Sequence, residues 1–257
     1  MRILITGAAR GLGAALANHF SDAGHEVYAW DLRDPDMVDA PQGVIVSEVP
    51  VDEVDMCSEG EILAAWRQLD PKPDVLINNA GVNRLSWLTD VVSTEEWEAV
   101  TGPVRGAQQL TGLFASFWTR MFADDQVGIE PRARVLNVSS VSARVNMRAT
   151  ATYCAAKAGM ERMTKVAARE LAGYGISVTA VAPGRIADGT EMGIYLDTKL
   201  PGLRGLDPAD MARYEMAAFP LGRRVDMREV VQAVDLVLQL PMACTGTVLE
   251  VAGAQAS

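Results

Sequence analysis

Short apolar runs alternate along the chain with longer stretches in which apolar residues recur at helical spacing. Runs of strand character cover residues 3–5, 26–30, 75–77, 135–138 and 177–182. Leu16, Ala17 and Phe20 form one of the helical stretches, which Gly24 closes. Strands that alternate with helices predict a doubly wound parallel sheet with helices on both faces. The 257 residues, 49% of them hydrophobic, suffice for one large domain with an ample core.

A glycine-rich turn directly follows the first of these runs. Residues 6–13 read Thr-Gly-Ala-Ala-Arg-Gly-Leu-Gly and lead into the helical stretch. Glycines let the backbone approach a pyrophosphate, and a helix N-terminus supplies amide donors and a partial positive charge. The order of strand, turn and helix therefore predicts a dinucleotide-binding loop. Its spacing, Gly-x-x-x-Gly-x-Gly, differs from the commoner Gly-x-Gly-x-x-Gly.

An acidic residue, Asp31, ends the second run, about 20 residues beyond the glycines. A carboxylate there can accept hydrogen bonds from the ribose hydroxyls of adenosine, and it repels a ribose phosphate. Asp31 therefore predicts NAD as the cofactor. Arg10 and Arg33 leave NADP as the alternative, because either guanidinium could pair with a ribose phosphate. Residues 31–43 are predicted to form a surface excursion.

Tyr153 and Lys157 lie four positions apart in a stretch of helical composition over residues 153–165. Residues at i and i+4 share a helix face, so the phenol and the ammonium are expected side by side. A cation about 4 Å away, at an effective dielectric of about 20, is worth roughly 4 kcal/mol. That would bring the pKa of the phenol close to neutrality. With Ser140 to hold a carbonyl or alcohol oxygen, the three side chains predict a general acid/base site.

Taken together, these segments resemble the classical short-chain dehydrogenase/reductase family over essentially the whole chain. The matching segments are Thr6 to Gly13, Asp31, Asn78 to Gly81, Ser140, Tyr153 with Lys157, Pro183-Gly184 and a last strand at 246–251. The resemblance implies a single Rossmann-type domain that transfers a hydride between a nicotinamide cofactor and a secondary alcohol or ketone. Tyr153 would be the acid/base, Ser140 the polariser of the substrate oxygen, and Lys157 the activator of the tyrosine. The thirteen-residue interval to Tyr153 favours Ser140 over Ser139 and Ser142.

The resemblance also implies the residues that contact the cofactor. They are Gly7, Arg10, Gly11, Leu12, Gly13, Asp31, Asp55, Met56, Asn79, Ala80, Gly81, Tyr153, Lys157, Pro183, Gly184, Ile186 and Thr190. Thr190 stands two residues beyond the position where the family usually has a threonine. A homodimer or homotetramer in the cytoplasm is expected, with no metal.

One position departs from the family pattern. Pro103 stands where the family has an asparagine that helps to hold a proton-relaying water. A proline removes a backbone donor and kinks a helix, which would leave the carbonyl of Ala99 to hold such a water. Activity is therefore expected. A catalytically silent nucleotide-binding or scaffold protein is the alternative of another class.

The segment 185–221 is long, rich in loops and mixed in character, and the resemblance implies a substrate lid there. Ordinary core under a helical cap is the alternative. Arg84, Arg144, Arg148 and Arg185 fall in segments expected near the open end of the pocket. Because arginine suits carboxylate or phosphate recognition, they predict an anionic substrate, with solvated surface arginines as the alternative.

Charge and composition exclude several classes of function. The net charge of −10 argues against nucleic-acid binding. No apolar stretch approaches the length of a membrane span, and the early first strand leaves no room for a signal peptide. Cys57, Cys154 and Cys244 form no disulfide or metal pattern and fit a reducing cytoplasm. Neither His19 nor His25 is expected to bind a ligand.

Overall fold

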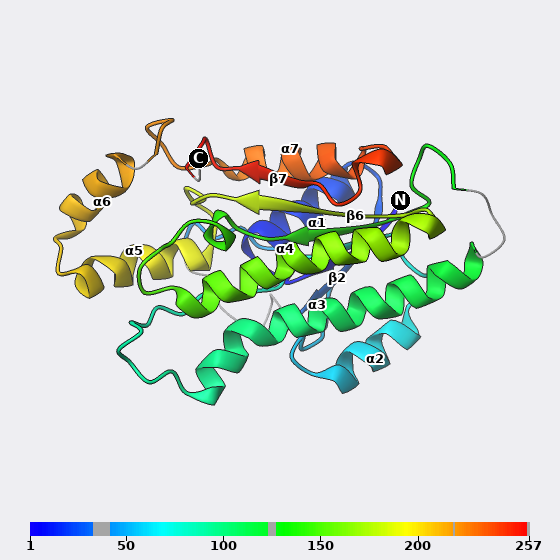
Figure 1. Ribbon diagram of the computed structural model, residues 1–257, viewed down its shortest axis with the longest axis horizontal. Helices are drawn as coiled ribbons and strands as arrows, with labels where there is room; N and C mark the ends of the chain where they lie inside the picture. Colours follow the sequence, from blue (N-terminus) through cyan, green and yellow to red (C-terminus); the bar gives the residue numbers. More distant parts are fainter. Residues whose placement is uncertain (33–41, 123–126, 218, 256–257) are drawn as a thin grey trace.

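The computed structural model describes residues 1–32, 42–122, 127–217 and 219–255, and most of the expected excursion at 31–43 lies outside them. The described residues form a parallel sheet of seven strands in the order β3-β2-β1-β4-β5-β6-β7, and Figure 1 shows β6 and β7 side by side at one edge of it. The strands are β1 (Arg2–Thr6), β2 (Glu26–Asp31), β3 (Val51–Glu53), β4 (Val75–Asn78), β5 (Ala133–Val138), β6 (Ile176–Pro183) and β7 (Val248–Val251). The doubly wound α/β fold expected from the sequence is confirmed.

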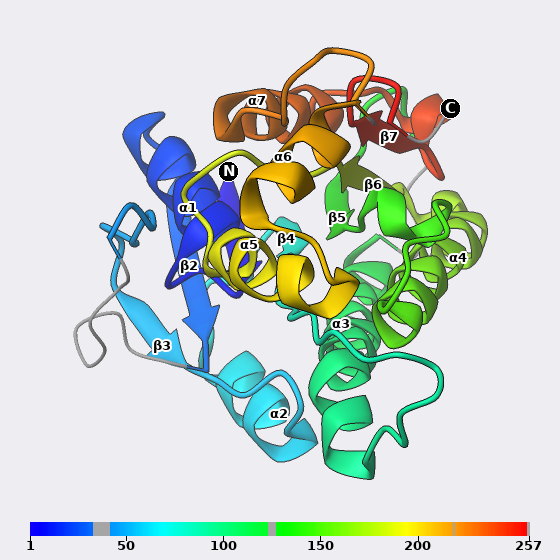
Figure 2. The same ribbon diagram turned by 90° about the vertical axis from the view of Figure 1, so that its left-hand side faces the viewer.

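Helices cover both faces of the sheet (Figure 2). On one face lie α1 (Gly11–Asp22) and α7 (Met227–Leu238), and on the other α2 (Glu59–Gln68), α3 (Thr94–Met121) and α4 (Ala151–Leu171). Successive strand residues point to opposite faces, so Ile3 and Ile5 pack in the core beside α1 and α7. Leu4, between them, packs in the second core beneath α2 and α3. Burial on both faces explains why the strands read as nearly continuous apolar runs.

Two further helices, α5 (Glu191–Arg204) and α6 (Pro208–Ala217), lie beyond the ends toward which β6 and β7 point (Figure 1). They pack on each other through Leu196, Leu200 and Met211, which are buried. Much of the segment expected to be rich in loops is therefore helical. These two helices stand over the edge of the sheet where the strand-end motifs meet.

A buried polar ladder crosses the centre of the sheet below that edge. Asn78 on β4 and Asn137 on β5 are partners in register, and the Asn78 Nδ2 donates to the Asn137 Oδ1 at 2.8 Å. The Asn78 amide also donates to Thr111 on α3 at 3.1 Å. The Asn137 amide donates to Thr164 on α4 at 2.9 Å. Two strands and the two helices beneath them are thus joined by side-chain hydrogen bonds.

Candidate active site

A cavity of about 1390 Å³ opens at the carboxyl ends of the strands, from the loop after β1 to α5 and α6. Every residue expected at the catalytic or cofactor site lines it. The lining includes Gly7, Arg10, Gly11, Leu12, Gly13, Asp31, Asp55, Met56, Asn79, Ala80, Gly81, Ser140, Tyr153, Lys157, Pro183, Gly184, Ile186 and Thr190. The lining of this cavity therefore brings together predicted site residues that lie up to 183 positions apart in the sequence.

The glycine-rich loop is shaped by close backbone contacts that admit no side chain. Gly7 has a φ of +67°, and a Cβ on Gly13 would lie 1.9 Å from the Gly7 carbonyl oxygen. The Asn79 Nδ2 donates to the carbonyls of Thr6 and Gly7, each at 3.0 Å, which ties the loop to the end of β4. The first turn of α1 has neither a side-chain cap nor an acidic residue. Its amide end therefore fits the pyrophosphate of a dinucleotide.

Asp31 and Arg10 flank this loop and have different partners. The Asp31 carboxylate accepts the backbone N–H of Ala9 at 2.9 Å. The Arg10 Nη1 donates to the Glu191 Oε1 at 2.5 Å, in the first turn of α5. Arg10 thus joins the dinucleotide loop to the helices over the cavity, a role for Glu191 that no local sequence signal reveals. Arg33 lies outside the described residues.

The acid/base candidates converge from β5 and α4. Ser140 follows β5 and precedes the short helix η2 (Val141–Ala143), while Tyr153 and Lys157 lie one turn apart on α4. Both α4 side chains are buried. The Ser140 side chain lies close enough to the Tyr153 phenol to influence its pKa, and the Ser140 hydroxyl accepts the backbone N–H of Ser142 at 3.2 Å. The Lys157 Nζ donates to the carbonyl of Val138 at 2.8 Å and lies 5.7 Å from the centre of the Tyr153 ring.

The ionisation of this pair differs from the sequence-based expectation. Burial raises the pKa of Tyr153 to about 12, although the Ser140 side chain acts to lower it. Burial also lowers the pKa of Lys157 to about 8. The prediction of a phenol close to neutrality is therefore wrong for this structure. Sequence spacing places the lysine beside the ring, but it does not show that the Nζ binds the Val138 carbonyl or that both groups are desolvated.

Ser139 and Arg144 belong to a separate polar cluster behind the catalytic candidates. The Ser139 hydroxyl contacts the Lys157 carbonyl at 3.3 Å and the Glu161 carboxylate at 3.2 Å. Arg144 bridges Glu161 and Glu250, with contacts of 3.1 Å to each. Arg144 is not among the residues that line the cavity, so its expected place at the open end of the pocket is wrong. Of the three serines, Ser140 is the one that lies close enough to Tyr153 to influence the pKa of its phenol.

Pro103 lies inside α3, which continues through it as one helix to Met121. Both Pro103 and Ala99 line the cavity, as the proposed water site would require. The flanking glycines bring α3 against the loop that carries Asp55. A Cβ on Gly102 would lie 2.6 Å from the Cys57 Sγ, and one on Gly106 would lie 1.9 Å from the Met56 carbonyl oxygen. The expected proton relay stays a prediction.

Fold and site together define a dinucleotide-dependent oxidoreductase, and the chain belongs to the short chain dehydrogenase family, whose family model matches residues 1–200. It is 35% identical to the acetoacetyl-CoA reductase of Shinella zoogloeoides over 195 residues, 74% of each chain. It is 32% identical to the 3-oxoacyl-[acyl-carrier-protein] reductase of Synechocystis sp. over 197 residues, 72% of this chain and 73% of that one. The family expected from the sequence is confirmed.

Solved structures show the same fold. The 3-ketoacyl-(acyl-carrier-protein) reductase of Brucella melitensis, complexed with NADH, matches with a TM-score of 0.78 at 24% identity, over 100% of this chain and 98% of that chain. A putative NAD(P) dependent gluconate 5-dehydrogenase of Beutenbergia cavernae, with bound NADP, matches with a TM-score of 0.77 at 26% identity, over 99% and 96% of the two chains. The fold is therefore one that binds a nicotinamide cofactor.

None of the helices in the described ranges is long and apolar enough to cross a membrane. Within the same ranges, no group of three or more histidine, cysteine, aspartate or glutamate side chains could hold a metal ion.

Proposed function

We propose that this enzyme interconverts a ketone and a secondary alcohol with a nicotinamide cofactor, NAD being favoured. The observation that carries this proposal is that Ser140, Tyr153, Lys157 and the glycine-rich loop line one cavity. Relatives that are named as acetoacetyl-CoA and 3-oxoacyl-[acyl-carrier-protein] reductases support a ketone as the substrate. The site needs no other redox partner, because the cofactor supplies or accepts the hydride when it is bound.

The residues around the substrate oxygen would bind it and move one proton. Ser140 and Tyr153 would donate hydrogen bonds to the carbonyl oxygen, which would polarise it. Tyr153 would then transfer its proton to that oxygen as the alcohol forms, or accept it back in the reverse reaction. Because its pKa is about 12, the phenol carries its proton at neutral pH. Tyr153 is therefore in the form that can donate a proton in ketone reduction.

Asp31 is the basis for the preference for NAD. Its carboxylate lines the cavity at the end of β2 and is anchored by the Ala9 N–H. It would accept hydrogen bonds from ribose hydroxyls and repel a ribose phosphate. An NADP-dependent carbonyl reductase is the alternative, since Arg10 also lines this part of the cavity. The ion pair of Arg10 with Glu191 supports NAD, because it already engages the guanidinium.

The test is a screen of ketones with NADH and NADPH, and of alcohols with NAD and NADP, by the absorbance of the reduced nicotinamide. Turnover that is lost in Tyr153→Phe would support the proposal. A wild-type chain that binds the cofactor but reduces no ketone and oxidises no alcohol would instead support the catalytically silent protein that Pro103 raises as an alternative.

Three expectations belong to the same proposal. Helices α5 and α6 would act as the substrate lid, because residues from both line the cavity, Leu196 and Tyr214 among them. The working form would be a homodimer or homotetramer, and the compartment the cytoplasm. Size-exclusion chromatography with light scattering tests the oligomeric state directly.

A further inference from the structure

We propose that the substrate carries a carboxylate and that Arg185 binds it, which makes the enzyme an oxo-acid reductase. This inference rests on the proposed function and names its substrate class. Arg185 follows Pro183-Gly184 at the end of β6 and lines the cavity. Strand β6 pairs with β5, with Val181 opposite Val138, so Arg185 and Ser140 leave neighbouring strands at the same edge of the sheet.

Arg185 has hydrogen-bond donors that the described residues do not satisfy. Its side chain is only 7% exposed, and its Nη2 donates to the Asp197 Oδ1 at 2.7 Å. Its Nε and Nη1 are buried, and neither has an acceptor within the described part of the chain. Burying a charged donor without an acceptor is costly, so such groups in folded proteins point to a partner from outside the chain. A carboxylate oxygen at the Nη1 would supply that partner.

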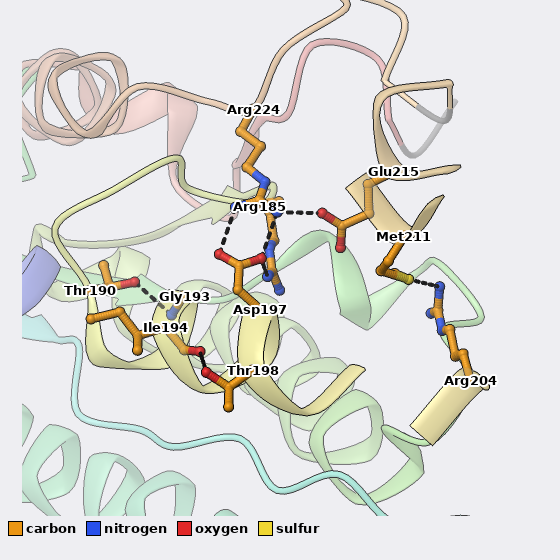
Figure 3. Close-up of polar contacts among 10 residues, drawn as sticks. All are labelled: Arg185, Thr190, Gly193, Ile194, Asp197, Thr198, Arg204, Met211, Glu215 and Arg224. Atoms are coloured by element: carbon orange, nitrogen blue, oxygen red, sulfur yellow. Dashed lines mark hydrogen bonds and ion pairs between the residues drawn. The ribbon is translucent and has the colours of Figure 1, made fainter. Parts of the chain in front are cut away.

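The ion pairs around Arg185 leave its Nε and Nη1 without an acceptor among the described residues. Asp197 is shared with Arg224, which contacts it at 2.7 Å and contacts Glu215 at 2.5 Å (Figure 3). With Arg185, the cluster holds two guanidinium groups and two carboxylates. Its charges balance, and Asp197 fixes the Arg185 side chain in place from α5. Arg185 is therefore held in position while its Nε and Nη1 stay unpaired among the described residues.

Positive charge exceeds negative charge at this end of the cavity. Arg84, Arg148 and Arg204 line it, and none of them forms an ion pair with a carboxylate in the ranges that the structure describes. Arg84 lies 5.9 Å from the ring centre of Tyr195, and Arg204 lies 5.5 Å from that of Tyr214. The net charge of the whole chain is −10, so this local positive charge is opposite in sign to the net charge of the molecule. Such an excess attracts an anionic substrate into the pocket.

The position of Arg185 distinguishes between two kinds of anionic substrate, a free oxo acid and a coenzyme A thioester. A carboxylate on a short oxo acid lies a few bonds from the reacting carbonyl, so we expect it near the adjacent strand ends that Ser140 and Arg185 follow. The phosphates of a coenzyme A thioester lie many bonds from the carbonyl and would reach only the outer part of the cavity. The burial of Arg185 therefore favours the free acid.

The experiment compares kcat/KM for short oxo acids of three to six carbons, their methyl esters and acetoacetyl-CoA, in the wild type, Arg185→Met and Arg185→Lys. Arg213→Met is the matched control, because Arg213 lies on α6, is exposed and pairs only with Asp210 among the described residues. We expect the wild type to prefer acids over esters. Arg185→Met should lower kcat/KM for the acids by roughly 10- to 100-fold and leave the esters nearly unchanged, since one charged hydrogen bond is lost. Arg185→Lys should recover part of the loss.

Each contrary outcome has its own meaning. Equal losses for acids and esters in Arg185→Met would show that Arg185 only supports the fold, which overturns the inference. A wild type that prefers esters or acetoacetyl-CoA would also overturn the inference. In that case, turnover that still depends on Tyr153 would leave the proposed ketone reduction intact. If no ketone or alcohol is turned over with either cofactor, both the proposed function and this inference fall.

Discussion

Lys157→Met should change the pH dependence of stability in a direction that only a buried cation produces. Lys157 is 5% exposed, and burial lowers its pKa from 10.5 to about 8. Between these two values the unfolded chain binds more protons at this residue than the folded chain does. The contribution of Lys157 to the free energy of unfolding should therefore rise with pH across this window. Methionine is of similar length and carries no proton, so the variant should lack that rise.

The size of the effect follows from the two pKa values. Holding the ammonium in the folded chain costs about 3 kcal/mol at pH 7 and about 1 kcal/mol at pH 10. Relative to Lys157→Met, the wild type should therefore gain about 2 kcal/mol over this range. Loss of the 2.8 Å hydrogen bond to the Val138 carbonyl shifts the variant by about 1–3 kcal/mol at every pH, so it does not alter the difference in slope. Tyr153 is present in both proteins, so its titration cancels.

Urea unfolding at pH 7, 8, 9 and 10 would measure this difference. Lys165→Met, which removes an exposed lysine from the same helix, is the matched control and should run parallel to the wild type. Parallel curves for the wild type and Lys157→Met would refute the reasoning, because the Lys157 ammonium would then be as well solvated in the folded chain as in the unfolded one.

Three other changes test the remaining parts of the site. Tyr153→Phe should keep the fold and lower turnover by about 10²–10⁴-fold; steady-state rates near those of the wild type would contradict its role. Asp31→Ser should narrow or reverse the preference for NADH over NADPH in fluorescence titrations, because a repulsion of roughly 4 kcal/mol per charge pair at about 4 Å is removed. Tighter binding of NADPH by the wild type would refute this. Gly106→Ala should destabilise the fold by about 1–3 kcal/mol, because its Cβ meets the Met56 carbonyl. Gly112→Ala, with open space around it, should not, and equal melting temperatures for the two variants would count against the close contact.

Much of the fold was predictable because the signals are local. A buried parallel strand needs an apolar run, and the observed strand β1 brackets the run predicted at residues 3–5. The loop after it needs glycine where the backbone contacts are closest, as at Gly13. The edge strand β3 had no such signal, because its three residues are largely exposed on the rim of the sheet.

The sequence predicts which residues form the site, but it does not predict their pKa values. Spacing placed Tyr153 and Lys157 on one face of α4, but the pKa of each depends on desolvation by distant segments. The same limit applies to the arginines. Arg185 and Arg144 have equal chemistry in the sequence, and only the tertiary structure shows one lining the cavity and the other bound between Glu161 and Glu250.

The polar ladder through Asn78 and Asn137 has a consequence for how the chain reaches a single register. Both faces of the central strands are buried, so an apolar run that slipped by one residue would still bury apolar side chains. A slip of β4 against β5 would, however, break the hydrogen bond between the two amides and leave a polar group unpaired in the interior. The ladder therefore penalises misaligned pairings of β4 with β5. Since Ser140 follows β5 by two residues, the same penalty sets the position at which its hydroxyl meets the phenol.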